Sequence, residues 1–399
     1  MANFNFMRTQ PADGANLDAF NRQRVSNLET ELDVSRINTK RTDLFDEKTV
    51  GTGSSAYRVY ESALNLSVTT TGDKAISQTK RNGYYQPGKS LLVEITGILD
   101  ADGQVGRIGY FDDLTDKTVD IMSGGVFFED NNGTISVVKR SCVSGSQVDT
   151  RINQADWNLD VMDGTGRSGK TFAVDKTNIF VFDGQWLGVG RVRLGLVIDG
   201  LIYYVHEFNH AGIEDTTYMT TFNYPLRWEI ISNGGAGEIK AICGSISSEG
   251  GYNPLGFLAS YNFGNSKVSV SNGTEKYLLA VRAKNTNLRI PINLRSLYQI
   301  IDANNPAVIR VYIADSLTGG TWSNNGLDSE INTTFTSITG SRLVFSSYLS
   351  DKNPTNSDRF FNQLITGSDI AGNSEIIIIS AEGLGNTSIA LALNYQELA

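Results

Sequence analysis

Cysteine and proline are scarce in this 399-residue sequence, which contains 2 and 7 of them, respectively. Two cysteines, Cys142 and Cys243, form at most one bridge, so a disulfide framework is excluded, while one bridge and two free thiols both remain open. Glycine is abundant, with 40 residues. Little proline together with much glycine, serine, threonine and asparagine is typical of turn-rich β structure. The length leaves room for two or three domains.

An excess of positive charge and long apolar runs are also lacking. The chain has 43 acidic and 34 basic residues, a net charge of −9, which argues against a nucleic-acid partner bound through general basic charge. The most uniform apolar run, Ile376–Ile379, is far too short to span a bilayer, so we expect no membrane insertion. The first ten residues lack the apolar core of a signal peptide.

The clearest structural signal lies near the middle of the chain. Arg191–Ile198 and Leu201–Phe208 both alternate, and Asp199-Gly200 joins them. A two-residue Asp-Gly loop between such runs predicts a β-hairpin with a type I′ turn. The register that follows pairs three sets of core residues: Ile198 with Leu201, Leu196 with Tyr203, and Leu194 with Val205.

The other face of this hairpin is only half apolar. Its residues are Arg193, Gly195, Val197, Ile202, Tyr204, His206 and Phe208. This face is too apolar for free exposure and too polar for a simple core. We therefore expect a second sheet or a sister subunit to cover part of it.

An H-E-x-x-H sequence runs from His206 to His210. On a helix this spacing places two histidines on one face, where they hold zinc while the glutamate acts as general base. The preceding residues are β-branched and aromatic, which favours a strand, and positions four apart on a strand stand about 13 Å from each other. Two ligands of one zinc must each lie about 2.1 Å from it, so we interpret these residues as a strand-end histidine pair and predict no metal site.

A second motif, from Gly164 to Thr171, satisfies the G-x-x-x-x-G-K-[ST] pattern of phosphate-binding loops. That chemistry needs a buried strand before the loop and a helix after it. Asp156–Asp163 is polar and acidic, and only Phe172–Thr177 separates the motif from the next apolar run at Ile179. Because no room is left for the helix, we interpret the motif as a glycine-rich surface loop and predict no cofactor.

Weaker candidates are generic. Acidic pairs such as Asp112-Asp113 and Glu129-Asp130 are candidate calcium ligands or solvated loop acids, and spacing alone selects no glycosidase pair among the 43 acids. The four tryptophans suit either sugar stacking or a core. No enzyme signature survives in its sequence context, so we predict no catalytic residue and no enzymatic activity.

Strand signals recur at regular spacing from about Tyr57. Before a predicted linker at Ser247–Gly256, and besides the hairpin, they cover Ala63–Thr69, Ser90–Leu99, Gln104–Phe111, Gly125–Glu129, Thr134–Arg140, Asn178–Phe182, Leu226–Ser232 and Glu238–Ser245. After it they cover Tyr277–Ala283, Leu288–Leu297, Ala307–Ala314, Arg342–Ser347, Glu375–Ala381 and Ser388–Gln396. Pro291 should confine its strand to a sheet edge. We predict an all-β chain with a lectin-like jelly-roll β-sandwich over residues 49–250 and a second β-sandwich over residues 251–399.

Residues 1–48 fit neither sandwich in this interpretation. Their apolar residues are scattered and their charges alternate in sign, so we predict an extended N-terminal docking arm ordered by contacts from elsewhere. Phe20 would be its apolar anchor, while Arg22 and Arg24 would share one face of an extended chain and meet acids on a partner. We predict that these three residues form an assembly interface.

The stretch Asp18–Ser26, with the sequence DAFNRQRVS, resembles the D-A-F-x-R-x-R-V-S opening of a family of tailed-phage and other virus-associated structural proteins. Further blocks are similar: Gln78–Arg81, Tyr85–Ser90, Arg107–Asp112, Val148–Asp160, Gln185–His210, Ser248–Tyr252 and, loosely, Leu393–Glu397. The resemblance covers the arm and the first domain well and the second domain loosely. It implies a virion component and supplies no catalytic motif.

We therefore expect a virion protein of a phage, a fibre, spike or decoration subunit docked through its N-terminal arm to other virion proteins. Fibre-like phage proteins are commonly trimers, so analogy favours a trimeric homo-oligomer. Two alternatives stay open. One is a module that recognises a host glycan through loops at one end of a sandwich. The other is a hydrolase that uses His206 and His210 or a pair of acids.

Overall fold

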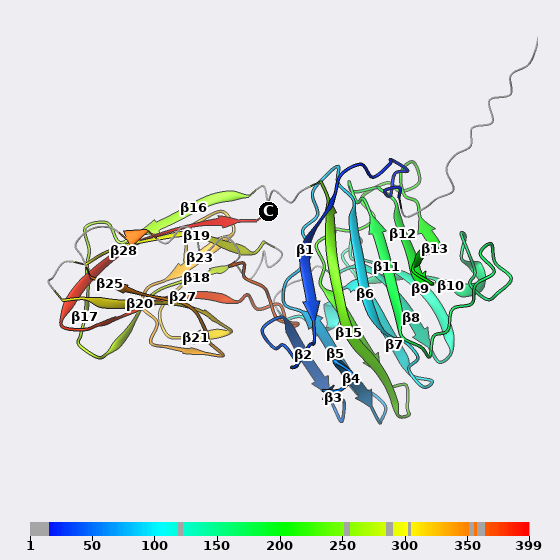
Figure 1. Cartoon of the computed structure of the whole chain (residues 1–399), viewed down its shortest axis with the longest axis horizontal. Coiled ribbons are helices and arrows are strands. Elements are labelled where there is room, and N and C mark those ends of the chain that lie inside the picture. Colours follow the sequence, from blue (N-terminus) through cyan, green and yellow to red (C-terminus); the bar gives the residue numbers. More distant parts are fainter. Residues whose placement is uncertain are drawn as a thin grey trace, which may run out of the picture. The chain divides into compact units, whose positions relative to one another are not determined.

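The computed structural model describes residues 16–118, 123–250, 256–284, 290–301, 305–350, 355–356 and 364–398. The chain divides into two compact units, Met1–Thr115 with Ile121–Tyr252, and Asp116–Asp120 with Asn253–Ala399. Antiparallel strands build both units (Figure 1), which confirms the predicted all-β class. The helical elements of the described residues are two 3-10 turns, η1 (Leu114–Asp116) and η2 (Gln154–Asp156), and no described helix is long and apolar enough to cross a membrane.

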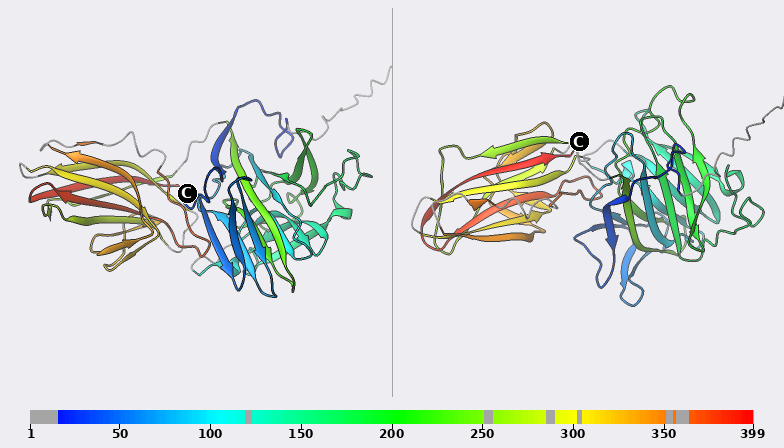
Figure 2. Two further views of the ribbon diagram at one scale, coloured as in Figure 1. Left: turned by 60° about the horizontal axis from the view of Figure 1, so that its bottom comes forward. Right: turned by 45° about the horizontal axis from the view of Figure 1, so that its top comes forward.

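Two sheets make up the first unit, and Figure 2 shows them from two further sides. The eight-stranded sheet has the order β13 (Leu201–Phe208), β12 (Val192–Ile198), β11 (Asn178–Gly184), β6 (Leu91–Ile98), β15 (Gly237–Glu249), β4 (Ala63–Val68) and β3 (Ser54–Arg58), with β1 (Leu28–Ser35) also paired to β15. The seven-stranded sheet has the order β10 (Val148–Asn153), β9 (Thr134–Ser141), β8 (Gly125–Asn131), β7 (Val105–Phe111), β14 (Leu226–Ile231), β5 (Lys74–Thr79) and β2 (Phe45–Val50).

The chain crosses repeatedly between these sheets. β4 lies in one sheet, β5 in the other, and β6 and β7 repeat the exchange. Alternating side chains from both sheets meet in one core cluster, to which Val93, Phe180 and Leu194 contribute from the first sheet and Ile108, Phe128 and Trp228 from the second. The first unit is thus the predicted jelly-roll sandwich, stabilised by burial of apolar side chains at roughly 1.5–3 kcal/mol for each large one.

The central hairpin forms with the predicted turn. Asp199 and Gly200 both have positive φ, 52° and 78°, as a type I′ turn requires. The register near the turn is as predicted, since Ile198 pairs with Leu201 and Leu196 with Tyr203.

Farther from the turn, the predicted hairpin register is wrong. The register shifts between Leu194 and Gly195, so Leu194 pairs with His206 instead of Val205. A bulge of this kind displaces the alternation by one residue. Phe208, predicted for the outer face, therefore packs in the core together with Val205.

The outer face of the hairpin is covered in part by the same chain. Tyr204 packs with Leu92 and Val181 in a small separate cluster, and Leu159 lies against it. Arg193 is fully buried and donates a hydrogen bond to the carbonyl oxygen of Leu17, 2.7 Å away. The N-terminal segment thus supplies cover that the sequence assigned to a second sheet or a sister subunit.

The prediction of a separate arm over residues 1–48 is wrong for its described part. β1 pairs with β15 from Leu28 to Ser35, and β2 pairs with β5 from Phe45 to Val50. Only the second half of β1 alternates in burial, with Leu32 and Val34 facing the core, so its apolar periodicity is too short to reveal a strand. Residues 1–15 of the predicted arm lie outside the described residues.

The second unit contains two main sheets and a short ribbon. The first sheet has the order β16 (Phe257–Asn262), β28 (Thr387–Glu397), β19 (Ile292–Ile301) and β26 (Thr355–Asn356), with β17 (Val268–Val270) on β28. The second has the order β22 (Ser323–Asn324), β23 (Ser329–Asn332), β18 (Glu275–Ala283), β27 (Ile376–Gly383), β20 (Ala307–Ala314) and β25 (Arg342–Leu349), and the ribbon pairs β21 (Ser316–Thr318) with β24 (Ser337–Thr339). Leu297 and Leu393 pack with Ile309 and Ile377 between the sheets, which makes the unit a second sandwich.

Four local expectations need correction or completion. The first residues of the linker predicted over Ser247–Gly256 belong to a strand, because β15 continues to Glu249, and residues 251–255 lie outside the described residues. The units divide after Tyr252, close to the predicted boundary after residue 250. Pro291 precedes β19, whose pairing with both β28 and β26 rules out an edge strand. Cys142 and Cys243 are both free thiols.

Candidate functional site

A tight turn in the N-terminal segment forms one side of the candidate site. The N–H of Asp18 donates to the carbonyl of Arg22, and the Asp18 carboxylate accepts the N–H groups of Phe20 and Arg22 at 2.8 Å. Asn21 stands in the left-handed region with φ 59°, which asparagine tolerates better than most residues. The turn leaves Phe20 at its tip, with 40% of its surface exposed.

Buried charges tie this segment to the eight-stranded sheet. The carboxylate of Asp183 on β11 is fully buried and accepts from Arg24 and Arg193, both at 2.6 Å, and from the hydroxyl of Tyr204 at 2.8 Å. Arg24 also pairs with Glu249 of β15 at 2.5 Å. The guanidinium groups of Arg24 and Arg193 and the carboxylates of Asp183 and Glu249 therefore neutralise one another between the segment and the sheet. Buried charges of this kind need partners, because they have lost their hydration.

The three residues predicted as an assembly interface do not share one role. Arg24 meets acids of its own sandwich and is only 9% exposed at its side chain, so its assignment to a partner surface is wrong. The side chain of Arg22 is 52% exposed and pairs with Asp18. Arg22 and Phe20 remain accessible, and their part in assembly stays a prediction.

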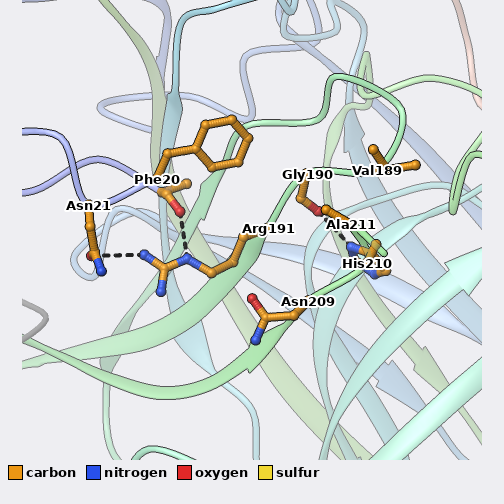
Figure 3. A pocket seen from close by; sticks show the side chains of 9 residues that line it. Phe20, Asn21, Val189, Gly190, Arg191, Asn209, His210 and Ala211 are labelled. Carbon is orange, nitrogen blue, oxygen red and sulfur yellow. Dashed lines mark hydrogen bonds between the residues drawn. The ribbon is translucent and has the colours of Figure 1, made fainter. Parts of the chain in front are cut away.

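A pocket of about 350 Å³ opens beside the turn. Its lining comes from three stretches of the first unit: residues 19–21, residues 189–191 and residues 209–211. Figure 3 shows Phe20 and Asn21 on one side, His210 on another, and Arg191 and Asn209 between them. The stretches meet because the carbonyl of Ala19 accepts a hydrogen bond from Arg191 Nε at 2.5 Å, across 172 positions of sequence.

Arg191 is the charged residue of the lining, and its charge is balanced locally. Its guanidinium pairs with Glu207 at 2.6 Å and donates to the side-chain oxygen of Asn21 at 3.1 Å. The other carboxylate oxygen of Glu207 accepts from the amide of Asn209 at 2.8 Å. The network fixes both amide orientations, because Asn21 must present oxygen to a cation and Asn209 must present nitrogen to an anion.

His210 forms part of the pocket floor and is 2% exposed. Its Nδ1 lies 2.6 Å from the carbonyl oxygen of Gly190, and its ring stacks on Tyr218 with centroids 3.7 Å apart. Burial lowers the pKa of His210 to about 4, so the imidazole is neutral at pH 7 and donates from Nδ1. Its Nε2 is buried without a hydrogen-bond partner among the described residues.

His206 lies on β13 and has a separate environment. Its Nδ1 accepts the N–H of Asn158 at 3.2 Å, and its ring packs edge-on against Phe208. Burial lowers the pKa of His206 to about 4 as well. The H-E-x-x-H sequence is therefore the strand-end pair that its sequence context indicated. Among the residues that the structure describes, no group of three or more histidine, cysteine or acidic side chains is placed to hold a metal.

The G-x-x-x-x-G-K-[ST] stretch forms a small closed loop. A β-bridge between Asp163 and Thr171 closes it, and Gly164 donates its N–H to the carbonyl of Lys170. The ammonium of Lys170 pairs with Asp199 at 2.7 Å. β11 follows the loop without an intervening helix, so this is the surface loop predicted from the sequence.

A second cluster of charges covers the face of the seven-stranded sheet that points away from the core. Arg107 bridges Glu129 and Glu229 at 2.8 and 2.7 Å. Burial alone would raise the pKa of Glu129, but Arg151 and Arg107 lower it below its ordinary value. Burial opposes ionisation of Glu229 too, yet Arg227, together with other nearby cations, holds its pKa well below the usual range. Both acids therefore stay ionised at neutral pH.

Sequence reasoning assigned other roles to Phe20, Arg24 and His210 and did not predict the pocket or its support. Asp183, Arg193 and Glu249 lie in strands where charged residues are unexpected, and their partner Arg24 is distant in sequence. One feature of the sequence did point to these stretches. The blocks Asp18–Ser26 and Gln185–His210, which carry the resemblance to virus-associated proteins, contain most of the residues that line the pocket.

No protein-family model and no curated protein matches the sequence. Solved structures match in fold at low similarity. A legume lectin-like domain from Entamoeba histolytica shares 12% identity over 55% of this chain and 98% of its own, with a TM-score of 0.31. A lectin from Bauhinia forficata in complex with GalNAc shares 12% identity over 54% and 97%, with a TM-score of 0.32. A protein of unknown function from Shewanella oneidensis MR-1 shares 8% identity over 59% and 90%, with a TM-score of 0.34. These values are too low to assign a ligand or an activity.

Proposed function

We propose that the protein is a structural component of a virus particle, a fibre, spike or decoration subunit of a phage that acts without catalysis. The main support is the resemblance of Asp18–Ser26 and Gln185–His210 to virus-associated structural proteins. These two blocks are in contact through the hydrogen bond between Arg191 and Ala19. The residues that carry the resemblance are therefore neighbours in the folded chain, although they are far apart in the sequence.

Assembly would use accessible residues of that unit. Phe20 and Arg22 lie at its surface, and Val25, next to Arg24, is 87% exposed. Other virion proteins and sister copies are the proposed partners, with a trimer favoured by analogy. In this proposal, the exposed side chains of Phe20, Arg22 and Val25 are the docking element, in place of the extended arm predicted from the sequence.

Absence of catalysis is part of the proposal. A glycosidase needs one carboxyl group that is protonated near neutral pH to act as general acid. Glu129 and Glu229, bridged by Arg107, are held ionised and do not suit that role. Burial raises the pKa of Glu31 to about 7, but this carboxyl group accepts the backbone N–H of Tyr84 and serves a structural contact in the proposal. The histidine pair is engaged in structural contacts at Asn158 and Gly190.

Particle fractionation tests this proposal directly. Virus particles would be purified on a density gradient, washed in high salt and probed with an antibody against the protein. We expect a fixed ratio of this protein to the major particle protein in every gradient fraction that contains particles. Recovery only in the soluble fraction, with none in washed particles, would contradict a virion role.

Host-glycan recognition is the second candidate function. The observation that favours it is the small open pocket at Phe20, Arg191 and Asn209, whose apolar and amide lining is typical of sites for small ligands. A glycan array probed with the full chain tests it. Binding to no glycan on the array would remove this candidate and leave the virion role to the fractionation experiment.

A further inference from the structure

The pocket beside the N-terminal turn presents complementary polar atoms on two of its three lining stretches. Asn21 uses its oxygen for Arg191, which leaves its amide hydrogens as donors. Asn209 uses its nitrogen for Glu207, which leaves its oxygen as an acceptor. Both side chains are exposed and line the pocket. A ligand that both accepts and donates hydrogen bonds fits this pair.

The charge of the pocket selects against ions. Arg191 carries the one formal charge of the lining, and Glu207 pairs with it at 2.6 Å. An anionic ligand would have to compete with that carboxylate, and a cationic ligand would meet the guanidinium. A neutral ligand avoids both costs.

The apolar surface of the pocket lies next to these amides. The ring of Phe20 is 40% exposed, and Val189 and Ala211 also line the pocket. The volume of about 350 Å³ falls in the range of small-ligand sites. A sugar ring combines the required features, because its adjacent hydroxyls accept and donate while its C–H face is apolar.

His210 lines the pocket and supports its floor, but it offers the ligand no hydrogen bond from Nε2. Its Nε2 is fully covered, so a molecule in the pocket does not reach it. Its bond to the Gly190 carbonyl holds residues 189–191 against residues 209–211. The pocket is therefore held in shape before any ligand binds, which reduces the entropic cost of binding.

We infer that this pocket binds a neutral saccharide unit, with Asn21 as donor, Asn209 as acceptor and Phe20 as the apolar platform. This inference rests on the second candidate function and specifies its site. The N-terminal turn is then a wall of the binding site, so ligand binding and the anchoring of this segment are coupled.

Two variants test the inference with the full chain. Phe20→Ala removes the platform, and Asn21→Gly removes the donor while glycine tolerates the positive φ of that position. Val25→Ala, on the same segment, is the control for the first. Asn38→Gly, at another exposed asparagine with φ 70°, is the control for the second.

Binding would be measured on an array of neutral hexoses and N-acetylhexosamines with matched sialylated and uronic-acid glycans, and by saturation-transfer NMR with the methyl glycosides of glucose, galactose, mannose and N-acetylglucosamine. We expect binding to neutral sugars that is unchanged between low and high salt. Phe20→Ala and Asn21→Gly should each weaken it about tenfold or more, a loss of about 1.4 kcal/mol. Both controls should bind like the parent chain, and all four variants should keep its melting temperature within a few degrees.

Three other outcomes of the binding experiment would contradict the site, the neutral charge of the ligand, or glycan binding as a whole. Neutral-sugar binding that neither Phe20→Ala nor Asn21→Gly weakens would place the site elsewhere and leave glycan recognition standing. Binding confined to acidic glycans and lost in high salt would refute the neutral ligand. Binding to no glycan would remove the inference and the second candidate function together, while the virion role would still rest on fractionation.

Discussion

Replacement of Asp183 by asparagine is the most informative single perturbation of the first sandwich. The carboxylate is fully buried and accepts from Arg24, Arg193 and Tyr204, and its other oxygen accepts from Ser90 at 2.9 Å. Asparagine preserves the shape of the side chain and removes its charge. Its NH₂ group would also face a donor, since every hydrogen bond at Asp183 here is one that the carboxylate accepts.

The expected cost follows from the burial of the partners. The side chain of Arg193 is fully buried and that of Arg24 is 9% exposed, so neither cation can recover full hydration. Removal of one partner from a buried ion pair costs about 3–5 kcal/mol, because the remaining charge is left uncompensated. We expect Asp183→Asn to lower the free energy of unfolding of the first sandwich by about that amount.

Urea unfolding monitored by tryptophan fluorescence measures the loss. Three of the four tryptophans, Trp157, Trp186 and Trp228, belong to the first unit and report its transition. Asp43→Asn is the matched control, because the pair of Asp43 with Arg41 is about one-third exposed and should contribute less than about 1 kcal/mol. A loss for Asp183→Asn as small as that for the control would refute this account of the buried charges.

Three further predictions concern the pH dependence of stability at Glu31, the pH dependence at the two histidines, and the lack of space for a side chain at Gly190. Burial raises the pKa of Glu31 to about 7, so the protonated side chain contributes fully to the free energy of unfolding below about pH 4.5, and this contribution is lost as pH rises through 7. Thermal melts should therefore show that Glu31→Gln stabilises the protein at pH 8, by up to about 3 kcal/mol, and brings no gain at pH 4. Burial lowers the pKa of both His206 and His210 to about 4, so the free energy of unfolding should fall as pH drops from about 6.5 to 4, by at most about 3 kcal/mol per histidine. The double glutamine variant should show a flatter pH profile. A Cβ at Gly190 would lie 1.7 Å from the carbonyl oxygen of Gln185, so Gly190→Ala should destabilise the first sandwich by more than about 2 kcal/mol in urea unfolding.

Local signals in the sequence predicted most of the longer strands of both sandwiches, but not shorter ones such as β5, β10 and β16. Ala307–Ala314 is found with its predicted bounds as β20, and the Asp199-Gly200 turn forms as expected. Both signals depend on neighbouring residues alone, on alternation for the strand and on tolerance of positive φ for the turn. The bulge at Val205 escaped prediction because it depends on how β13 packs on the core.

The first strands escaped for a different reason. The seven residues from Leu28 to Val34 include only three large apolar side chains, of which Leu32 and Val34 reach the core, and β1 pairs with β15 through its backbone. Short alternation of this kind does not distinguish a strand from an extended tail. The described part of residues 1–48 was therefore assigned to a docking arm when it belongs to the sandwich.

The pocket was beyond local reasoning because its walls come from distant parts of the chain. Arg191 meets Ala19 and Asn21 across some 170 positions, and neither stretch carries a binding pattern by itself. The H-E-x-x-H and glycine-rich patterns were locally conspicuous, but their strand and loop contexts remove the chemistry that each motif needs on a helix. Context, more than pattern, decided the outcome at both motifs.

Deletion of residues 1–45 tests most directly the claim that the N-terminal segment belongs to the first sandwich and builds its pocket. The deletion removes β1, the Arg24 contacts with Asp183 and Glu249, and one pocket wall. Calorimetry of the truncated chain should show the second sandwich melting as in the full chain and the first melting at least 10 °C lower or not folding, as expected for a loss of several kcal/mol in a domain of this size. Two unchanged transitions would contradict the account and restore the segment as an independent docking arm.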